Sequence, residues 1–352
     1  MRAIGCVERM PLQEQTNLHR RYTVGRVLAE DAYSFTYAGM DTKARQAVMI
    51  REFFPELLAA RTADSSAVSP QNKSCGELFF LASEAFRSQY AVLTQAIGNA
   101  NIISVFDAFF ANGTAYAITE PEEGVSLAEY VRMQERPLLE GELAYIAKAL
   151  SDALLVVHSL SIMHHDITAE NILLCTDGTV KLTDFGAARV TVRDRRQTDE
   201  AQPWKDLQGL GRALYEAYTG QPVPTDAAQC EKYLSPMLAG VLERMLTDDP
   251  SLRFDSVFDF LHAAEGLDIR PVRPRVTTDW ILAYRQTEQA RATQQERLER
   301  ARMRERNRPQ LREAQKNINA TTEQPRMRPL WILACGIVLL GTMAALLIRY
   351  LR

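Results

Sequence analysis

The chain has 352 residues, 46% of them hydrophobic, enough to bury the core of one domain of about 250 residues with further segments beside it. Its net charge of −3 averages an acidic part, residues 1–280 with −11, and a basic part, residues 281–328 with +6, which argues against nucleic-acid binding by the larger part. The five cysteines are odd in number and form no CxxC pair, which favours reduced thiols over a zinc ribbon or a disulfide framework.

The N-terminal third predicts a small β-sheet with one helix. Residues 1–21 contain charged side chains and no apolar run long enough for a secretory signal, so they are assigned to an N-terminal extension. Residues 78–97 have the apolar spacing of a helix, and Asn112-Gly113 is typical of a tight hairpin turn. β-branched and aromatic residues predict strands at residues 21–28, 33–37, 46–54, 102–106 and 115–119.

The middle of the chain predicts a mainly helical region. Apolar residues recur at helical spacing in five segments, at residues 126–133, 140–160, 204–219, 234–246 and 256–264. A small sheet with one helix is therefore followed by a bundle of helices.

A polar linker is predicted at residues 266–328. Its part from 280 to 308 is rich in Ala, Gln, Glu and Arg, which favours a helix without an apolar face or a partly disordered spacer. Seven arginines from Arg297 to Arg312 leave two interpretations open, contact with anionic lipid and a plain solvated helix.

The C-terminal segment predicts a membrane anchor. Leu330 to Ile348 is a run of 19 residues without a charge, which as a helix would span roughly 28 Å, close to the hydrocarbon thickness of a bilayer. We assign residues 329–349 to a transmembrane helix and 350–352 to a short tail; a buried core helix is the alternative. Because arginines are concentrated before the span, the positive-inside rule predicts a single-pass protein of the cell membrane with its large domain in the cytoplasm.

Three side chains follow one another in the order of a phosphotransfer site. Asp166 and Asn171 lie in one run, and Asp184 opens the triplet Asp184-Phe185-Gly186. In protein kinases the first acid accepts the proton of the substrate hydroxyl, and the Asn and the second Asp hold magnesium on the phosphates of ATP. Asp166, Asn171 and Asp184 are therefore candidate catalytic residues, and Asn171 and Asp184 are candidate metal ligands.

These motifs together resemble a eukaryotic-like serine/threonine protein kinase of bacterial type, over residues 22–265. Asp206 stands where that family has an acid that braces the catalytic loop, and Arg253 belongs to a stretch that resembles its late DPxxR motif. The resemblance implies an α+β, bilobal protein-kinase-like fold with a small β-rich N-lobe and a helical C-lobe. It also implies ATP and Mg²⁺ as cofactors.

Five residues are assigned to nucleotide binding on this resemblance. Arg51 stands where the family has a lysine on its third strand, and Glu84 is the best candidate for the helix acid that pairs with it. Glu120, Asn171 and Asp184 complete the set. Arginine keeps the charge of the lysine, but its planar fork does not place a point charge where an ammonium sat.

The chain also departs from the family pattern. Ala29, Asp31 and Ser34 stand where the three glycines of the phosphate-covering loop belong, and a carboxylate there would repel phosphates. His165 replaces the arginine that reads a phosphorylated activation loop, and Thr168 replaces a catalytic-loop lysine. We expect His164 and His165 to be hydrogen-bonded loop residues and not metal ligands.

The activation segment is short. Only 17 residues separate Gly186 from Trp204, and none of them spells the APE motif of the platform that docks a protein substrate. Arg253 therefore lacks its family partner, and we expect it to pair elsewhere or to face solvent.

The departures favour a degenerate family member that resembles a pseudokinase. Its predicted role is that of a membrane-anchored signalling scaffold or nucleotide-responsive binding module, with weak or no phosphotransfer. Because Asp166, Asn171 and Asp184 are all present, a divergent active serine/threonine kinase and another nucleotide-using transferase remain alternatives. The predicted partners are a protein partner or substrate and the membrane, and not nucleic acid.

Overall fold

The structure, a computed structural model, describes residues 9–62, 65–186, 191, 202–224, 234–287, 289–291 and 294. The chain up to Tyr284 forms one compact unit, and a second unit begins at Arg285. The predicted membrane span and most of the basic linker lie outside the described residues. Among the helices of the described part, none has the length and hydrophobicity of a membrane span.

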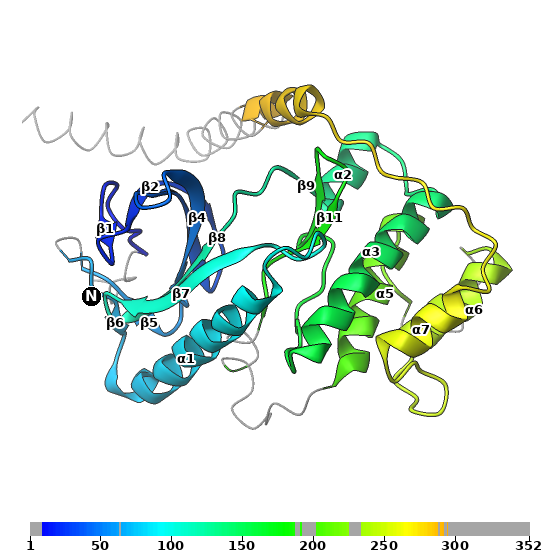
Figure 1. Cartoon of the computed structure of the whole chain (residues 1–352), viewed down its shortest axis with the longest axis horizontal. Coiled ribbons are helices and arrows are strands. Elements are labelled where there is room, and N and C mark those ends of the chain that lie inside the picture. Colours follow the sequence, from blue (N-terminus) through cyan, green and yellow to red (C-terminus); the bar gives the residue numbers. More distant parts are fainter. Residues whose placement is uncertain are drawn as a thin grey trace, which may run out of the picture. The chain divides into compact units, whose positions relative to one another are not determined.

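A six-stranded antiparallel sheet forms the N-lobe, residues 9–119 (Figure 1). Its strand order is β1-β2-β3-β4-β8-β7. The strands are β1 (Asn17–Leu18), β2 (Tyr22–Glu30), β3 (Ser34–Asp41), β4 (Gln46–Phe53), β7 (Val105–Ala111) and β8 (Thr114–Thr119). The β1 strand lies in the predicted N-terminal extension and pairs with β2, with Leu18 opposite Tyr22.

The hairpin of β7 and β8 turns at the predicted dipeptide. Asn112 and Gly113 have φ values of 49° and 76°, the left-handed conformation that a two-residue hairpin turn needs. A Cβ on Gly113 would lie 2.4 Å from the carbonyl oxygen of Val68, so only glycine fits. The strand predicted at 102–106 was misplaced, because β7 begins at Val105 and Ile102 forms only an isolated bridge with Leu182.

One long helix, α1 (Gly76–Leu93), packs on the inner face of the sheet, and is flanked by the short 3-10 turns η1 (Lys73–Cys75) and η2 (Thr94–Ala96). Phe79 and Phe86 of α1 lie against Phe53 of β4, with ring centroids 6.0 and 5.5 Å apart. These aromatic contacts fix the position of the helix relative to β4.

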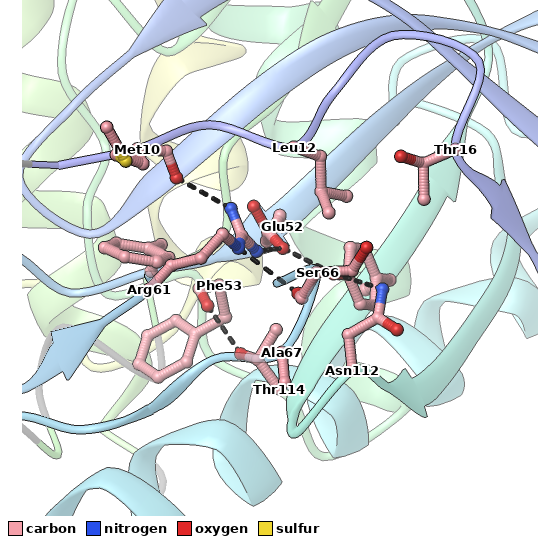
Figure 2. Close-up of polar contacts among 12 residues, drawn as sticks. Met10, Leu12, Thr16, Glu52, Phe53, Arg61, Ser66, Ala67, Asn112 and Thr114 are labelled. Carbon is pink, nitrogen blue, oxygen red and sulfur yellow. Dashed lines mark hydrogen bonds and ion pairs between the residues drawn. The ribbon is translucent and has the colours of Figure 1, made fainter. Parts of the chain in front are cut away.

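A buried polar network lies on the outer face of the same strand (Figure 2). Glu52, fully buried, accepts hydrogen bonds from the hydroxyls of Tyr37, at 2.7 Å, and Tyr116, and is ion-paired with Arg61. Arg61 also donates to the carbonyl of Met10 at 2.8 Å. The network therefore joins the sheet to the N-terminal segment and to the chain between β4 and α1, which contains β5 (Ala59–Ala60) and β6 (Ser69–Pro70).

The C-lobe begins at Gly124 with a three-stranded sheet of order β11-β10-β9. Helices follow or flank these strands, and Ser126 and Ser256 begin two of them with capping boxes. Its elements are β9 (Gly124–Ser126), α2 (Leu127–Gln134), α3 (Glu140–Ser159), β10 (Ile172–Cys175), β11 (Val180–Leu182), α5 (Pro203–Thr219), α6 (Pro236–Leu246) and α7 (Val257–Ala264). The predicted α+β, two-lobed architecture is confirmed.

The first part of the predicted linker packs on the C-lobe. Val276 and Ile281 are buried, and the ring of Trp280 meets that of Tyr130 edge-on at 5.7 Å. The amide of Val272 donates to the carbonyl of Gly141 in α3 at 2.8 Å. The folded unit therefore extends beyond residue 265.

Candidate active site

Asp206 holds residues 162–174, the segment that resembles the family's catalytic loop, through hydrogen bonds to its backbone. Its carboxylate, on α5, accepts hydrogen bonds from the amides of His164 and His165 at 2.8 and 2.9 Å and lies 2.9 Å from Nε2 of His158. Burial would raise the pKa of Asp206, but the hydrogen bond from His158 and the loop amides outweigh it and lower the pKa. These bonds hold His165 in a left-handed backbone conformation, with φ of 68°.

His164 is a buried structural residue. Nδ1 accepts from the amide of Asp166 at 3.2 Å, so the proton is on Nε2, which donates to the carbonyl of Thr183 at 2.8 Å. Burial lowers its pKa and keeps the ring neutral. Within the described part of the chain, no group of three or more His, Cys, Asp or Glu side chains is placed to hold a metal ion.

Asp166 and Asn171 lie together in the loop between α3 and β10. The side-chain amide of Asn171 donates to the carbonyl oxygen of Asp166 at 2.8 Å and to its Oδ2 at 3.1 Å. Gly186 crosses closely behind Asp166, since a Cβ on Gly186 would lie 2.8 Å from the Cβ of Asp166. The structure thus brings the two predicted catalytic-loop residues and the magnesium-loop glycine into one place.

Asp184 forms an ion pair with Arg51. Nη2 of Arg51 lies 2.7 Å from Oδ1 of Asp184 and 3.7 Å from Oδ2 of Asp31, which stands at the tip of the β2–β3 hairpin. Asp184 has a φ of 58°, a strained conformation for a residue with a Cβ. The predicted nucleotide-binding cation and the predicted metal ligand therefore bind each other.

The charge of Arg51 is held by several carboxylates. Its side chain is buried, which alone would lower its pKa. The negative charges of Asp184, Asp31 and Glu122 outweigh burial and raise the pKa of Arg51. The guanidinium is therefore a permanent cation within a group of acids.

Asp31 closes the hairpin tip on itself. Its Oδ1 accepts from the amides of Tyr33 and Ser34 at 2.6 and 3.0 Å, and its Oδ2 accepts from the hydroxyl of Ser34 at 2.8 Å. The hairpin is therefore held by a side chain at a position where the related family has glycine and an open backbone.

The expected pair of Arg51 with Glu84 was wrong. Glu84 lies on the more exposed side of α1 and is bound by Arg87 at 2.6 Å and by the hydroxyl of Ser88 at 3.0 Å. The face of α1 that packs inward contains Gln89, whose amide donates to the carbonyl of Met163 at 2.9 Å. The helix thus contacts the catalytic loop through an amide and not through an acid.

Glu120 joins the two lobes. Its Oε1 lies 2.6 Å from Nζ of Lys181 on β11 and accepts from the amide of Ser104 at 2.7 Å. The carboxylate is therefore engaged by protein groups on both sides of the chain segment that connects β8 to β9. Its assignment to nucleotide binding stays a prediction.

Met49 also faces the connecting segment, which comprises residues 120–123. The amide of Glu122 donates to Sδ of Met49 at 3.3 Å. Met49 stands two residues before Arg51 on β4, so both side chains lie on the same face of the strand. Sequence reasoning missed this methionine, although strand alternation from Arg51 would have found it.

Arg253 was expected to pair elsewhere or to face solvent, and the structure confirms that it pairs elsewhere. Its guanidinium lies over the ring of Trp204, 4.1 Å from the centroid, and its Nε is 3.5 Å from Asp255. Trp204 therefore takes the partner role at the start of α5. The residues between Gly186 and Trp204 lie almost entirely outside the described part, so the form of the activation segment stays a prediction.

Comparisons with known proteins agree with this geometry. The protein kinase domain family matches residues 82–204. The chain is 27% identical to the probable serine/threonine-protein kinase PknB of Lactococcus lactis, over 37% of this chain and 23% of that protein, and 31% identical to the serine/threonine-protein kinase STE20 of Eremothecium gossypii, over 35% and 14%. A solved structure described as PpkA-294 apo form aligns with a TM-score of 0.61 at 20% identity, covering 72% of this chain and 99% of that one.

Residues 82–204 match the protein kinase domain family, and the chain is similar to a bacterial serine/threonine protein kinase. It spans less than a quarter of the length of the two curated kinases named above. The likeness to the solved structure concerns the fold alone, because the two chains are only 20% identical. The matched kinase domain and the two-lobed fold agree with the resemblance drawn from the sequence motifs.

Proposed function

We propose that the chain is a membrane-anchored, kinase-fold binding module with weak or no phosphotransfer. The observation that carries this proposal is the contact of 2.7 Å between Arg51 and Asp184. A cation already lies on the carboxylate that would hold magnesium, and Asp31 adds a negative charge beside it. Mg²⁺ would have to displace Arg51 before it reached Asp184.

The arrangement does not fit Mg·ATP well. Asp184 and Asn171 supply the oxygen ligands that Mg²⁺ takes. However, Asp31 and Glu122 act on the same space as Asp184, and ATP phosphates are strongly negative. His165 and Thr168 remove two further charges that the family uses. Loss of one preorganised electrostatic contact typically costs about 10²–10³ in rate, and defects in one site act as a unit.

Membrane attachment and partner binding complete the proposal. The uncharged run from Leu330 to Ile348 supports an anchor, and the arginines before it support a cytoplasmic kinase-like unit. A protein partner is the expected ligand of a kinase fold that signals without catalysis. Deletion of residues 329–352 should move the protein from the membrane fraction to the soluble fraction of a cell lysate.

Mg·ATP titration of the full-length protein tests the nucleotide part. A bound ligand stabilises the folded state by RT ln(1 + [L]/Kd), so we expect millimolar Mg·ATP to raise the melting temperature little, and no more than in Asp184→Ala. Transfer of radiolabelled phosphate to protein should stay at background. Transfer that disappears in Asp166→Ala would overturn the proposal.

One observation favours the alternative, a divergent active kinase. Asn171 holds Asp166 through two hydrogen bonds, an arrangement that would orient a catalytic base. The alternative therefore predicts measurable transfer, lost in Asp166→Ala and strongly reduced in Asn171→Ala, which the radiolabel experiment decides.

A further inference from the structure

The inner face of β4 presents two side chains to the region between the lobes. Met49 and Arg51 alternate with Val48 and Ile50, which are buried on the opposite face. Arg51 reaches Asp184, which marks the end where phosphates and metal would bind. Met49 lies about 6.6 Å further along the strand, two residues away, opposite Thr119 at the end of β8.

The position of Met49 is where the base of a nucleotide would have to lie. A nucleotide with its phosphates near Asp184 and Arg51 would extend along this face of β4 towards the connecting segment. The amide of Glu122 in that segment is a backbone donor that a heteroaromatic ring nitrogen would accept from. In this structure its acceptor is the thioether of Met49, at 3.3 Å.

We propose that Met49 is an internal plug that fills the base-binding end of the interlobe site and excludes purine nucleosides from it. This inference rests on the proposed function, since it explains why the family's nucleotide would not be held. Met49 blocks the site in two ways. Its side chain fills the space beside the connecting segment, and its sulfur accepts the hydrogen bond of the Glu122 amide.

The chemistry of methionine makes the plug removable. A thioether is a weak hydrogen-bond acceptor, and the side chain has three rotatable bonds. The Glu122 amide therefore gains little from its present partner and would gain more from a ring nitrogen. Truncation of Met49 should free both the space and the donor without unfolding the sheet, because Met49 is only half-buried.

Adenosine is the probe that isolates this end of the site. It contains the base but no phosphate, so Arg51, Asp31 and Asp184 do not oppose it. We expect Met49→Ala in the full-length protein to lower the Kd for adenosine at least tenfold in isothermal titration calorimetry. Mg·ATP should gain less, because the charges at the other end are unchanged.

Two further variants serve as controls. Met40→Ala removes a methionine from β3 that is 46% exposed and lies opposite Ala47, away from the connecting segment, and should leave the adenosine Kd unchanged. Met49→Leu keeps the volume and removes the sulfur, and should still bind adenosine at least fivefold more weakly than Met49→Ala. Melting temperatures of all variants show that each is folded.

The inference and the proposed function fail in different ways. An adenosine Kd of Met49→Ala within twofold of the wild type would overturn the plug, as would equal tightening by Met40→Ala or by Met49→Leu. Phosphotransfer by the wild-type protein would overturn the proposed function while leaving the comparison of adenosine affinities readable.

Discussion

Arg51 and Glu52 are neighbours in β4, and their side chains enter two charge clusters on opposite faces of the sheet. On the outer face, Glu52 is bound by Arg61, Tyr37 and Tyr116, and Arg61 in turn donates to backbone carbonyls. On the inner face, Arg51 binds Asp184 and Ser34, yet no described residue accepts a hydrogen bond from its buried Nε. The polar groups of the outer cluster are all hydrogen-bonded, whereas the inner cluster contains a buried donor, Nε of Arg51, without an acceptor among the described residues.

We therefore expect the outer cluster to stabilise the fold and the inner cluster to exchange its partners. In the outer cluster, burial and the negative charge of Glu52 raise the pKa values of Tyr37 and Tyr116, which keeps both hydroxyls as donors. In the inner cluster, several acids compete for one guanidinium. We therefore expect substitutions outside to change stability and substitutions inside to change binding.

The largest effect should follow from breaking the outer cluster. Arg61→Met leaves the buried carboxylate of Glu52 without its counter-ion, which should lower the free energy of unfolding by about 3–5 kcal/mol. Denaturant unfolding of the full-length protein measures this loss. The double variant Glu52→Gln/Arg61→Met removes the charge as well and should recover part of the loss; a single-variant loss below about 1 kcal/mol would contradict the comparison.

Arg51→Met should change binding more than folding. Loss of the guanidinium removes the ion pair between Arg51 and Asp184, at a cost of about 1–3 kcal/mol. With this cation gone, the Asp184 carboxylate should bind Mg²⁺ more tightly, so millimolar MgCl₂ should raise the melting temperature of the variant and leave the wild type unchanged. The additional change Asp184→Ala should abolish the Mg²⁺ effect. Equal stabilisation of the wild type by Mg²⁺ would show that Arg51 does not block the metal.

Asp41, at the rim of the sheet, offers a smaller effect that depends on pH. The hydrogen bond from the half-exposed Arg21 lowers the pKa of Asp41 to about 2. The folded state thus binds fewer protons than the unfolded state between about pH 4 and pH 2, so this contribution is full above that range and is lost as pH falls through it. Asp41→Asn should remove no more than about 1 kcal/mol at pH 6 and less near pH 2. Denaturant midpoints at both pH values test this, and an equal loss at both would contradict it.

Glu84→Gln should have the smallest effect. Glu84 pairs with Arg87 across one turn of α1, and such pairs contribute about 0.2–0.5 kcal/mol. Since Glu84 does not reach Arg51, the variant should also keep the wild-type response to MgCl₂. A shift in Mg²⁺ binding equal to that of Arg51→Met would mean that the helix acid does act on the site.

Local motifs predicted much of the fold, and long-range packing decided the rest. Strand alternation and helical spacing predicted β2, β3 and β4 and the helices within a few residues, because these patterns are written in neighbouring residues. The acid beneath the catalytic loop was also predicted, since Asp206 lies in a recognisable stretch before a helix. The hairpin turn followed from the left-handed preference of Asn112-Gly113.

The partner of Arg51 was not predictable in the same way. Choosing between Glu84 and Asp184 requires the rotation of α1 about its axis, which Phe79 and Phe86 set by packing on β4. Strand alternation places Met49 on the same face as Arg51, but its contact with Glu122 depends on the path of the connecting segment. Signals for both were present in the alternation of β4, but they pointed to a face and not to a partner.

The N-terminal segment limits how far this domain can be truncated. Arg9 donates to the carbonyls of Asp31 and Phe54 at 2.6 and 2.9 Å, and the amide of Leu12 donates to the hydroxyl of Tyr37 at 3.0 Å. A protein trimmed to begin at residue 22, where the kinase resemblance begins, would lose these bonds together with β1. It would expose the outer cluster to water and release the hairpin tip that carries Asp31. The shortest part of this protein that we expect to fold alone therefore begins before residue 22, because residues 9–12 cover the buried charges of the sheet.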